Sequence, residues 1–126
     1  MYRMISTKAL REFNSRNPPT ITLGRKDDVQ KKYDKFCKDS ENGKRFISRI
    51  TDILEESDYY FVENDYPYYV EPNITHMICW YKKGKPSEIL KNICEKSCVI
   101  TYWENLPYNK SIPDINHIHV FISKLK

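Results

Sequence analysis

The stretch HIHVFI at residues 117–122 decides the fold, because two kinds of side chain alternate along it. Successive side chains of a β-strand point to opposite faces of a sheet, so this alternation predicts a strand. Its two isoleucines and its valine then face the core. His117, His119 and Phe121 face the other way, and we expect that face of the sheet to be open.

A second strand is predicted for the sequence ITHMICWY at residues 74–81, which is apolar on both faces. This strand carries His76, and the chain has three histidines in all. If it lies near the strand at residues 117–122, the three imidazoles converge on one face of the sheet.

Helices are predicted before and between the strands. The expected elements are a helix over 6–13 capped by Ser6, a helix from Asp27 or Asp28 that Gly43 interrupts, a helix over 46–57, strands over 59–62 and 98–103, and a helix that Ser87 caps. Strands joined by short connections usually pair antiparallel. We therefore predict an α+β fold with N-terminal helices followed by a β-β-α-β-β antiparallel sheet, the helices packed on one face.

The length of 126 residues suits a single domain. We divide it into an N-terminal arm (1–22), a core (23–122) and a basic tail (123–126). No apolar run approaches the roughly 20 residues that span a bilayer. The N-terminus also lacks the apolar segment of a signal peptide. We expect a soluble, cytoplasmic protein with no membrane partner.

Charge and cysteine content exclude further classes. The net charge is +4, but no lysine or arginine lies between Arg49 and Lys82. A nucleic-acid partner is therefore not expected, because such a partner needs a continuous basic face. The four cysteines lack zinc-site spacing and are predicted to be small buried residues. A disulfide between Cys94 and Cys98 is the alternative.

Three chemistries would use a group of His76, His117 and His119. The first is a divalent metal site, completed by a carboxylate from Glu63, Asp65 or Glu104. The second is catalysis by a nucleophilic or acid–base imidazole. The third is the binding of a phosphate or sugar without turnover. The alternative to all three is that these histidines make ordinary hydrogen bonds.

An aromatic cluster lies just before the second strand, and it includes Tyr66 and Tyr68. Tyrosine combines a flat apolar face with a hydroxyl, which suits stacking on bases or sugars. Packing around Pro67 is the alternative. Asn64 and Asp65 are typical turn residues that present side chains beside a sheet edge. Trp80 is predicted to be core or pocket wall.

Three stretches resemble an uncharacterised fungal family that includes the N-acetylglucosamine-induced protein. They are Arg25 followed by Tyr33, then NDYPY with Pro72 and ITHMICW (64–80), then WEN, SI and HIHVF (103–121). The resemblance covers residues 23–122. It implies one domain in which these residues matter, and it implies no mechanism.

The ending of the chain is also similar to the histidine-triad nucleotide hydrolases and transferases. His117 and His119 occupy the first two alternating places of that motif, and Phe121 stands at the third. Asn105 lies about where that family keeps an asparagine. The resemblance implies that His119 is the nucleophile.

Two functions follow from these observations. In the first, the domain is a phosphoester or nucleotide hydrolase or transferase, with His119, His117 and His76 as catalytic residues. In the second, it is a non-catalytic ligand-binding or protein-interaction module. In both, the residues expected to bind the ligand are Asn64, Asp65, Tyr66, Tyr68, Trp80 and Asn105. The expected partner is a small phosphorylated ligand, a nucleotide or a protein.

Overall fold

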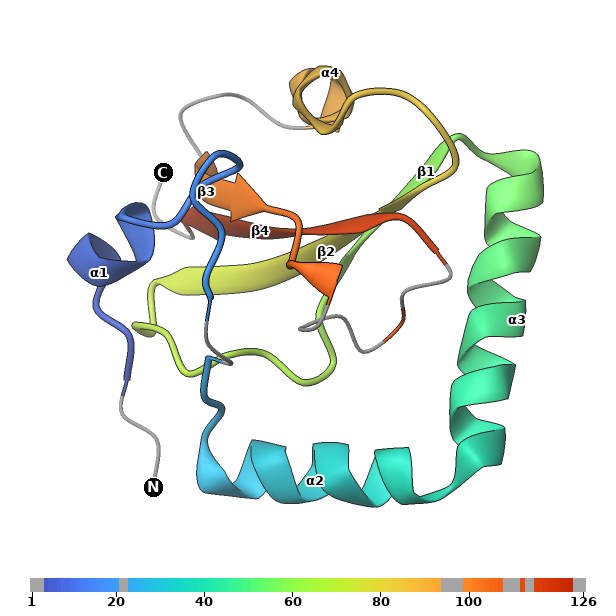
Figure 1. Cartoon of the computed structure of the whole chain (residues 1–126), viewed down its shortest axis with the longest axis horizontal. Helices are drawn as coiled ribbons and strands as arrows, with labels where there is room; N and C mark the ends of the chain where they lie inside the picture. The colour runs from blue at the N-terminus through green and yellow to red at the C-terminus, as the bar shows by residue number, and fades with distance from the viewer. Residues whose placement is uncertain (1–3, 21–22, 94–98, 108–111, 113–114, 124–126) are drawn as a thin grey trace.

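The computed structural model describes residues 4–20, 23–93, 99–107, 112 and 115–123. The elements are α1 (Thr7–Arg11), α2 (Asp27–Lys38), α3 (Ser40–Glu56), β1 (Tyr59–Glu63), β2 (Ile74–Tyr81), α4 (Pro86–Ile93), β3 (Val99–Trp103) and β4 (His117–Ser123). Figure 1 shows the sheet in the middle of the molecule, with α4 on one side of it and α2 on the other.

The strands form one four-stranded antiparallel sheet in the order β1-β2-β4-β3. This confirms the predicted α+β fold with an antiparallel sheet. β2 and β4 are the two central strands and pair directly. Their register places His76 opposite Phe121, Ile78 opposite His119 and Trp80 opposite His117. The predicted neighbourhood of the two histidine-bearing strands is therefore correct.

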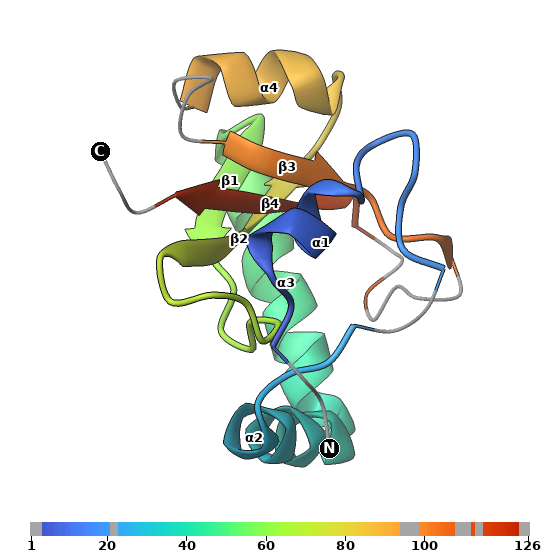
Figure 2. The ribbon, with the colours of Figure 1, turned by 90° about the vertical axis from the view of Figure 1, so that its left-hand side faces the viewer.

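The sequence suggested that the helices pack on one face of the sheet. In the structure they cover both faces. Ile89 and Leu90 of α4 pack with Cys79, Tyr81, Ile118 and Val120 on one face. Ile50 and Leu54 of α3 pack with Ile78 and Trp80 on the opposite face. Figure 2 shows α4 above the sheet, with α3 and α2 extending below it. The physical reason is that the central strand β2 is apolar on both faces, so each face has to be covered.

The helix boundaries differ from the prediction at two places. α2 and α3 are separated by Asp39, whose side chain accepts a hydrogen bond from the Glu41 amide at 2.9 Å. Gly43 lies inside α3 and does not interrupt it. An aspartate cap stabilises a new helix start, and this outweighs the weak helix preference of one glycine. The second difference is at α4, where Ser87 was expected to cap the helix. The helix begins one residue earlier, at Pro86, so Ser87 lies within it.

The N-terminal segment belongs to the packed structure. Ser6 caps α1 as predicted, since its hydroxyl accepts from the Ala9 amide at 3.1 Å. Leu10 is fully buried with Trp103 and Phe121. The Thr101 hydroxyl on β3 donates to the Phe13 carbonyl at 2.6 Å. These contacts attach the first residues to the edge of the sheet.

Cysteine burial matches the prediction at one position and not at another. Cys79 is buried as predicted, whereas Cys37 is exposed because α2 buries none of its residues. Cys94, Cys98 and the basic tail at 124–126 lie outside the described residues. Among the helices that the structure describes, none is long and apolar enough to cross a membrane.

Candidate functional site

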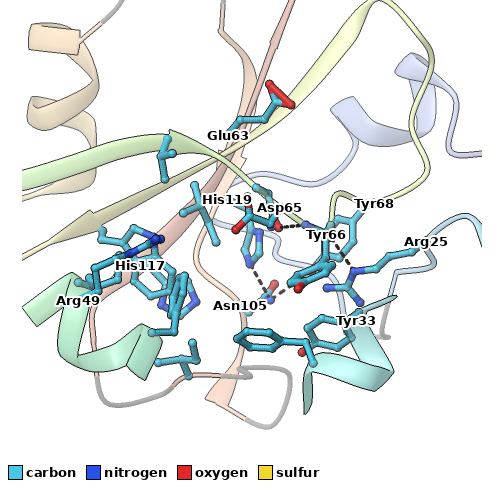
Figure 3. Close-up of a pocket in the computed structure, with 18 of the residues that line it drawn as sticks. Arg25, Tyr33, Arg49, Glu63, Asp65, Tyr66, Tyr68, Asn105, His117 and His119 are labelled. Atoms are coloured by element: carbon cyan, nitrogen blue, oxygen red, sulfur yellow. Dashed lines mark hydrogen bonds between the residues drawn. The ribbon is translucent and has the colours of Figure 1, made fainter. Parts of the chain in front are cut away.

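A cavity of about 390 Å³ lies between the α3-covered face of the sheet and helix α2. Its walls are largely aromatic, with Tyr33 and Phe36 from α2, Phe46 from α3, and Tyr66 and Trp80. Figure 3 shows Arg25 and Tyr33 on one side of this cavity and His117 and Arg49 on the other. All six residues predicted from the sequence to bind a ligand line it, namely Asn64, Asp65, Tyr66, Tyr68, Trp80 and Asn105, together with His117 and His119.

The turn before β2 places two tyrosines in the cavity wall. The Asn64 side-chain oxygen accepts from the Tyr66 amide at 2.8 Å, as expected of an Asn-based turn. The Asn64 amide donates to the His76 carbonyl at 2.9 Å, which attaches the turn to β2. The Tyr66 ring packs against Tyr33 and Phe36 at 5.4 and 5.6 Å between centroids. The turn therefore connects the sheet to helix α2.

His76 and His119 form a direct pair across the two central strands. His76 Nε2 lies 2.7 Å from His119 Nδ1. His117 stands apart, because its ring centroid is 5.8 Å from that of His119 and its Nδ1 donates to the Ile115 carbonyl at 2.8 Å. The predicted convergence is thus confirmed for two imidazoles, and the third stacks on Trp80.

The expectation of an open histidine face is wrong. His76, His117 and His119 are 1, 4 and 5% exposed, and Phe121 is fully buried. Phe121 stacks between His76 and Trp103, at 4.5 and 4.8 Å between ring centroids. Aromatic side chains cover these imidazoles, and an alternating sequence pattern cannot reveal such coverage.

Burial keeps the histidine pair neutral. The pKa of His76 lies well below its ordinary value, mainly because burial removes water from the charged form. Charge repulsion from His119 and then from Arg25 lowers it further. The pKa of His119 is lowered to about 3, mainly by burial and to a smaller extent by charge repulsion from His117 and Arg25. Both imidazoles are therefore uncharged at physiological pH.

Asn105 extends this pair towards β3. The Trp103 indole N–H donates to Asn105 Oδ1 at 2.9 Å. Asn105 Nδ2 lies 3.0 Å from His119 Nε2 and 3.4 Å from the Tyr68 hydroxyl. The backbone amide of Tyr68 donates to His76 Nδ1 at 3.0 Å. One continuous buried network thus includes three residues that the sequence predicted as separate candidates, His76, His119 and Asn105.

Arg25 is a cavity residue that sequence reasoning did not assign to the site. It is 9% exposed, and its Nε donates to the Tyr66 carbonyl at 2.7 Å. The guanidinium carbon lies 4.1 Å from the Tyr33 ring centroid and 5.2 Å from that of Tyr68. In the part of the chain that the structure describes, no carboxylate forms an ion pair with it. The available signal was the Arg25–Tyr33 spacing that carried part of the fungal resemblance.

The predicted carboxylates do not complete a metal site. Glu63 and Asp65 line the exposed rim of the cavity. Glu104 instead accepts from the Tyr81 hydroxyl at 3.4 Å. Burial and this carboxylate raise the pKa of Tyr81 to about 12. Within the described residues, no three histidine, cysteine or acidic side chains are arranged to hold a metal ion.

Comparison with known proteins gives one family match and one structural neighbour. Residues 48–89 match the model of a family described as "Protein of unknown function (DUF3605)". The solved structure described as "Crystal Structure of HTC1" is 19% identical, with a TM-score of 0.53 over 80% of this chain and 76% of that chain. At this identity the likeness concerns the fold alone. The comparison with curated proteins found no match.

The matched family segment begins within α3, continues through β1, the turn at 64–68 and β2, and ends within α4. It therefore includes Asn64, His76 and Trp80 but not Arg25, Asn105 or β4. Neither match names the N-acetylglucosamine-induced proteins or the histidine-triad enzymes, so those two resemblances stay predictions. The comparisons support similarity to an uncharacterised family and an α+β fold.

Proposed function

We propose that this domain binds a small organic anion, with the flat part of the ligand between the aromatic walls and its charge against Arg25. The observation that carries the proposal is a buried arginine on the cavity wall that forms no ion pair with any carboxylate of the described residues. Arginine is rarely buried without an opposite charge, because removing the guanidinium from water is costly.

The surroundings of Arg25 compensate its charge only in part. The faces of the Tyr33 and Tyr68 rings carry partial negative charge and attract the guanidinium. The Tyr66 carbonyl accepts one hydrogen bond from it, but none of these groups is an anion. These contacts also hold the Arg25 guanidinium in place on the cavity wall. A fixed guanidinium is well suited to bind a carboxylate or a phosphate through two parallel hydrogen bonds.

The size and lining of the cavity suit a small ligand. Cavities that bind such compounds are typically about 300–1,000 Å³, mostly apolar, with a few placed polar groups. This cavity is about 390 Å³ and combines six phenylalanine, tyrosine and tryptophan side chains with Arg25, Asn105 and His119. The predicted small phosphorylated ligand belongs to the same chemical class.

Binding without turnover fits the histidine geometry better than hydrolysis. A nucleophilic imidazole must present a nitrogen lone pair to the phosphorus atom. His119 Nδ1 is 2.7 Å from His76 Nε2, and His119 Nε2 is 3.0 Å from Asn105 Nδ2. Both ring nitrogens are engaged inside the protein. Catalytic roles for the three histidines are therefore not part of this proposal.

The test is a titration by ¹H–¹⁵N NMR with phenyl phosphate, benzoate and benzylamine, which share one ring and differ in charge. We expect the two anions to bind and the amine not to bind. Arg25→Met should weaken anion binding by about tenfold or more, as expected for loss of a hydrogen bond to a charged group. Arg16→Met, which removes an exposed arginine outside the cavity, is the matched control. Equal binding by Arg25→Met, or a preference for benzylamine, would overturn the proposal.

A further inference from the structure

The cavity has a second arginine in its lining, Arg49 on α3. Figure 3 shows this residue on the opposite side of the cavity from Arg25. The guanidinium carbon of Arg49 lies 5.5 Å from the ring centroid of Phe46, which comes three residues earlier on the same helix and also lines the cavity. This contact holds the charged end of an otherwise exposed side chain beside the cavity.

Arg49 forms no ion pair, although its own helix carries a carboxylate at a suitable spacing. Asp52 follows three residues later on α3, and side chains at this spacing can meet on a helix surface. On the same helix, Lys44 does form such a pair with Glu41, at 3.5 Å between nitrogen and oxygen. Among the residues that the structure describes, no carboxylate pairs with either cavity arginine. Two positive charges of the lining are therefore left to interact with a ligand.

Aromatic side chains adjoin both arginines in the cavity wall. At one side, the Tyr33 ring, which contacts Arg25, packs against Tyr66 at 5.4 Å between centroids. At the other side, the Phe46 ring packs against Trp80 at 5.4 Å. An anionic group placed against such rings would lose its hydration without gaining a hydrogen bond. The cavity thus combines a positive charge at each side with a wall that favours an apolar group.

The two acidic residues of the lining do not cancel this arrangement. Glu63 and Asp65 are exposed at the rim and pair with neither arginine in the described part of the chain. Asp65 lies near Tyr66, because burial and then the charge of this aspartate raise the pKa of that phenol. A ligand anion is repelled from this part of the rim, which directs it towards the arginines.

We propose that the ligand carries two anionic groups joined by a flat apolar spacer, with one group bound by Arg25 and the other by Arg49. This inference rests on the proposed anion-binding function and adds the number and the placement of the charges on the ligand. A compound with one anionic group leaves one guanidinium without a counter-charge. A compound with a cationic second group is repelled by Arg49.

The experiment compares ligands that match in shape and differ by one charge. Terephthalate and biphenyl-4,4′-dicarboxylate carry a carboxylate at each end, at two different separations, and each is compared with its monomethyl ester. The dissociation constants come from ¹H–¹⁵N NMR titrations at about 0.15 M salt, where charges more than about 8 Å apart are largely screened. We expect at least one dianion to bind wild type about fivefold more tightly than its monoester, as is typical of an ion pair at a partly exposed site.

Arg49→Gln tests whether this residue holds the second charge. It should remove most of the difference between the dianion and its monoester, because glutamine keeps a polar side chain without a charge. Arg45→Gln is the matched control and should keep the difference. It makes the same charge change on the same helix, but Arg45 donates to Asn42 Oδ1 at 3.4 Å and lies outside the cavity lining.

The outcomes separate this inference from the proposed function. A preference for the dianion that is lost only in Arg49→Gln supports the inference. If the monoesters bind and neither dianion binds more tightly, the inference fails and the proposed function stands. The inference also fails if the preference persists in Arg49→Gln, or if Arg45→Gln removes it equally. If none of these compounds binds, and phenyl phosphate and benzoate do not bind either, the proposed function fails together with the inference.

Discussion

The two faces of the sheet are equally buried but differ in chemistry. On the α4 side, Ile118 and Val120 alternate along β4 and pack against Cys79, Ile89 and Leu90 in an apolar cluster. On the α3 side, the intervening residues of the same strand are His117, His119 and Phe121, of which the two histidines line the cavity. Successive residues of β4 therefore lie alternately in an apolar core and on the side of the sheet that carries the cavity.

This difference indicates which face provides stability and which face provides the site. Apolar packing contributes most where no polar group loses its hydration. The histidine face buries imidazoles, an asparagine and an arginine, which is costly unless each group is hydrogen-bonded. We therefore expect mutations on the α4 side to change stability alone, and mutations on the histidine face to change binding as well.

The largest expected effect compares two isoleucines on opposite faces of the central strands. Ile118→Ala in the apolar cluster should cost about 4 kcal/mol in the free energy of unfolding. Ile78→Ala should cost only about 2 kcal/mol, because Ile78 borders the cavity and makes fewer contacts on that side. Urea denaturation measures both values. Equal losses would contradict the distinction between the faces.

The next effect is a loss of stability at acidic pH that comes from the histidine face. His76 and His119 have folded-state pKa values below their ordinary value of 6.5, so the unfolded chain takes up protons first as the pH falls. Their contribution is complete above pH 6.5 and is lost progressively as the pH falls, for His119 down to its folded-state pKa of about 3. Between pH 7.5 and 5 we expect a loss of about 2 kcal/mol for each of the two imidazoles.

Urea denaturation at several pH values tests this dependence, and His76→Gln should reduce its slope by about half because one of two buried imidazoles is removed. Hydrogen bonds to Thr7 lower the pKa of Glu71, so its protonation reduces stability only below the ordinary carboxyl pKa of 4.5. This effect lies outside the range from pH 7.5 to 5 in which the histidines are tested. An unchanged slope in His76→Gln would contradict the assignment to the histidine pair.

A smaller effect is expected where the histidine face meets the N-terminal segment. Thr101→Val removes the hydroxyl that donates to the Phe13 carbonyl but keeps the shape of the side chain. We expect a loss of about 1.5 kcal/mol, typical of a buried acceptor left without its donor. Thermal unfolding measures it. No change in the melting temperature would show that this hydrogen bond does not contribute to holding the segment.

The smallest effect concerns the helices that cover the cavity. Asp39→Ala removes the cap at the start of α3 and should cost about 1 kcal/mol. Asp39→Asn keeps a capping oxygen and is the matched control. Because α2 meets α3 at this residue, we also expect faster amide exchange in α2 in the alanine variant. Equal exchange in both variants would contradict a role of the cap in positioning α2.

Much of the fold could be predicted because local patterns determine local structure. The alternation along 117–122 and the apolar run at 74–81 are strands as predicted, and Ser6 caps the first helix. The pairing of β2 with β4 brings His76 to His119 as expected. The break at Asp39 was missed, because Gly43 is the weaker helix former and the capping hydrogen bond cannot be identified from composition.

The candidate site was predicted in part. Asn64, Asp65, Tyr66, Tyr68 and Trp80 all line the cavity, because turn and strand patterns place side chains predictably. Asn105 lines it as well, but it was predicted only from the resemblances to known families. Arg25 was not assigned to the site, since a single arginine between a loop and a helix has no distinctive pattern. Its importance follows from burial without a carboxylate, which is a property of the packed molecule.

The sequence by itself determined the strands, the helices and the shared face of the histidines, because these depend on the periodicity of side chains along the backbone. Only the tertiary structure decided that this face is covered by α3 and that Arg25 reaches the cavity. It also decided that Trp103 and the Tyr68 amide orient the hydrogens of Asn105 and the histidine pair. These properties depend on contacts between residues far apart in the chain, and no local pattern specifies burial or the direction of a hydrogen bond.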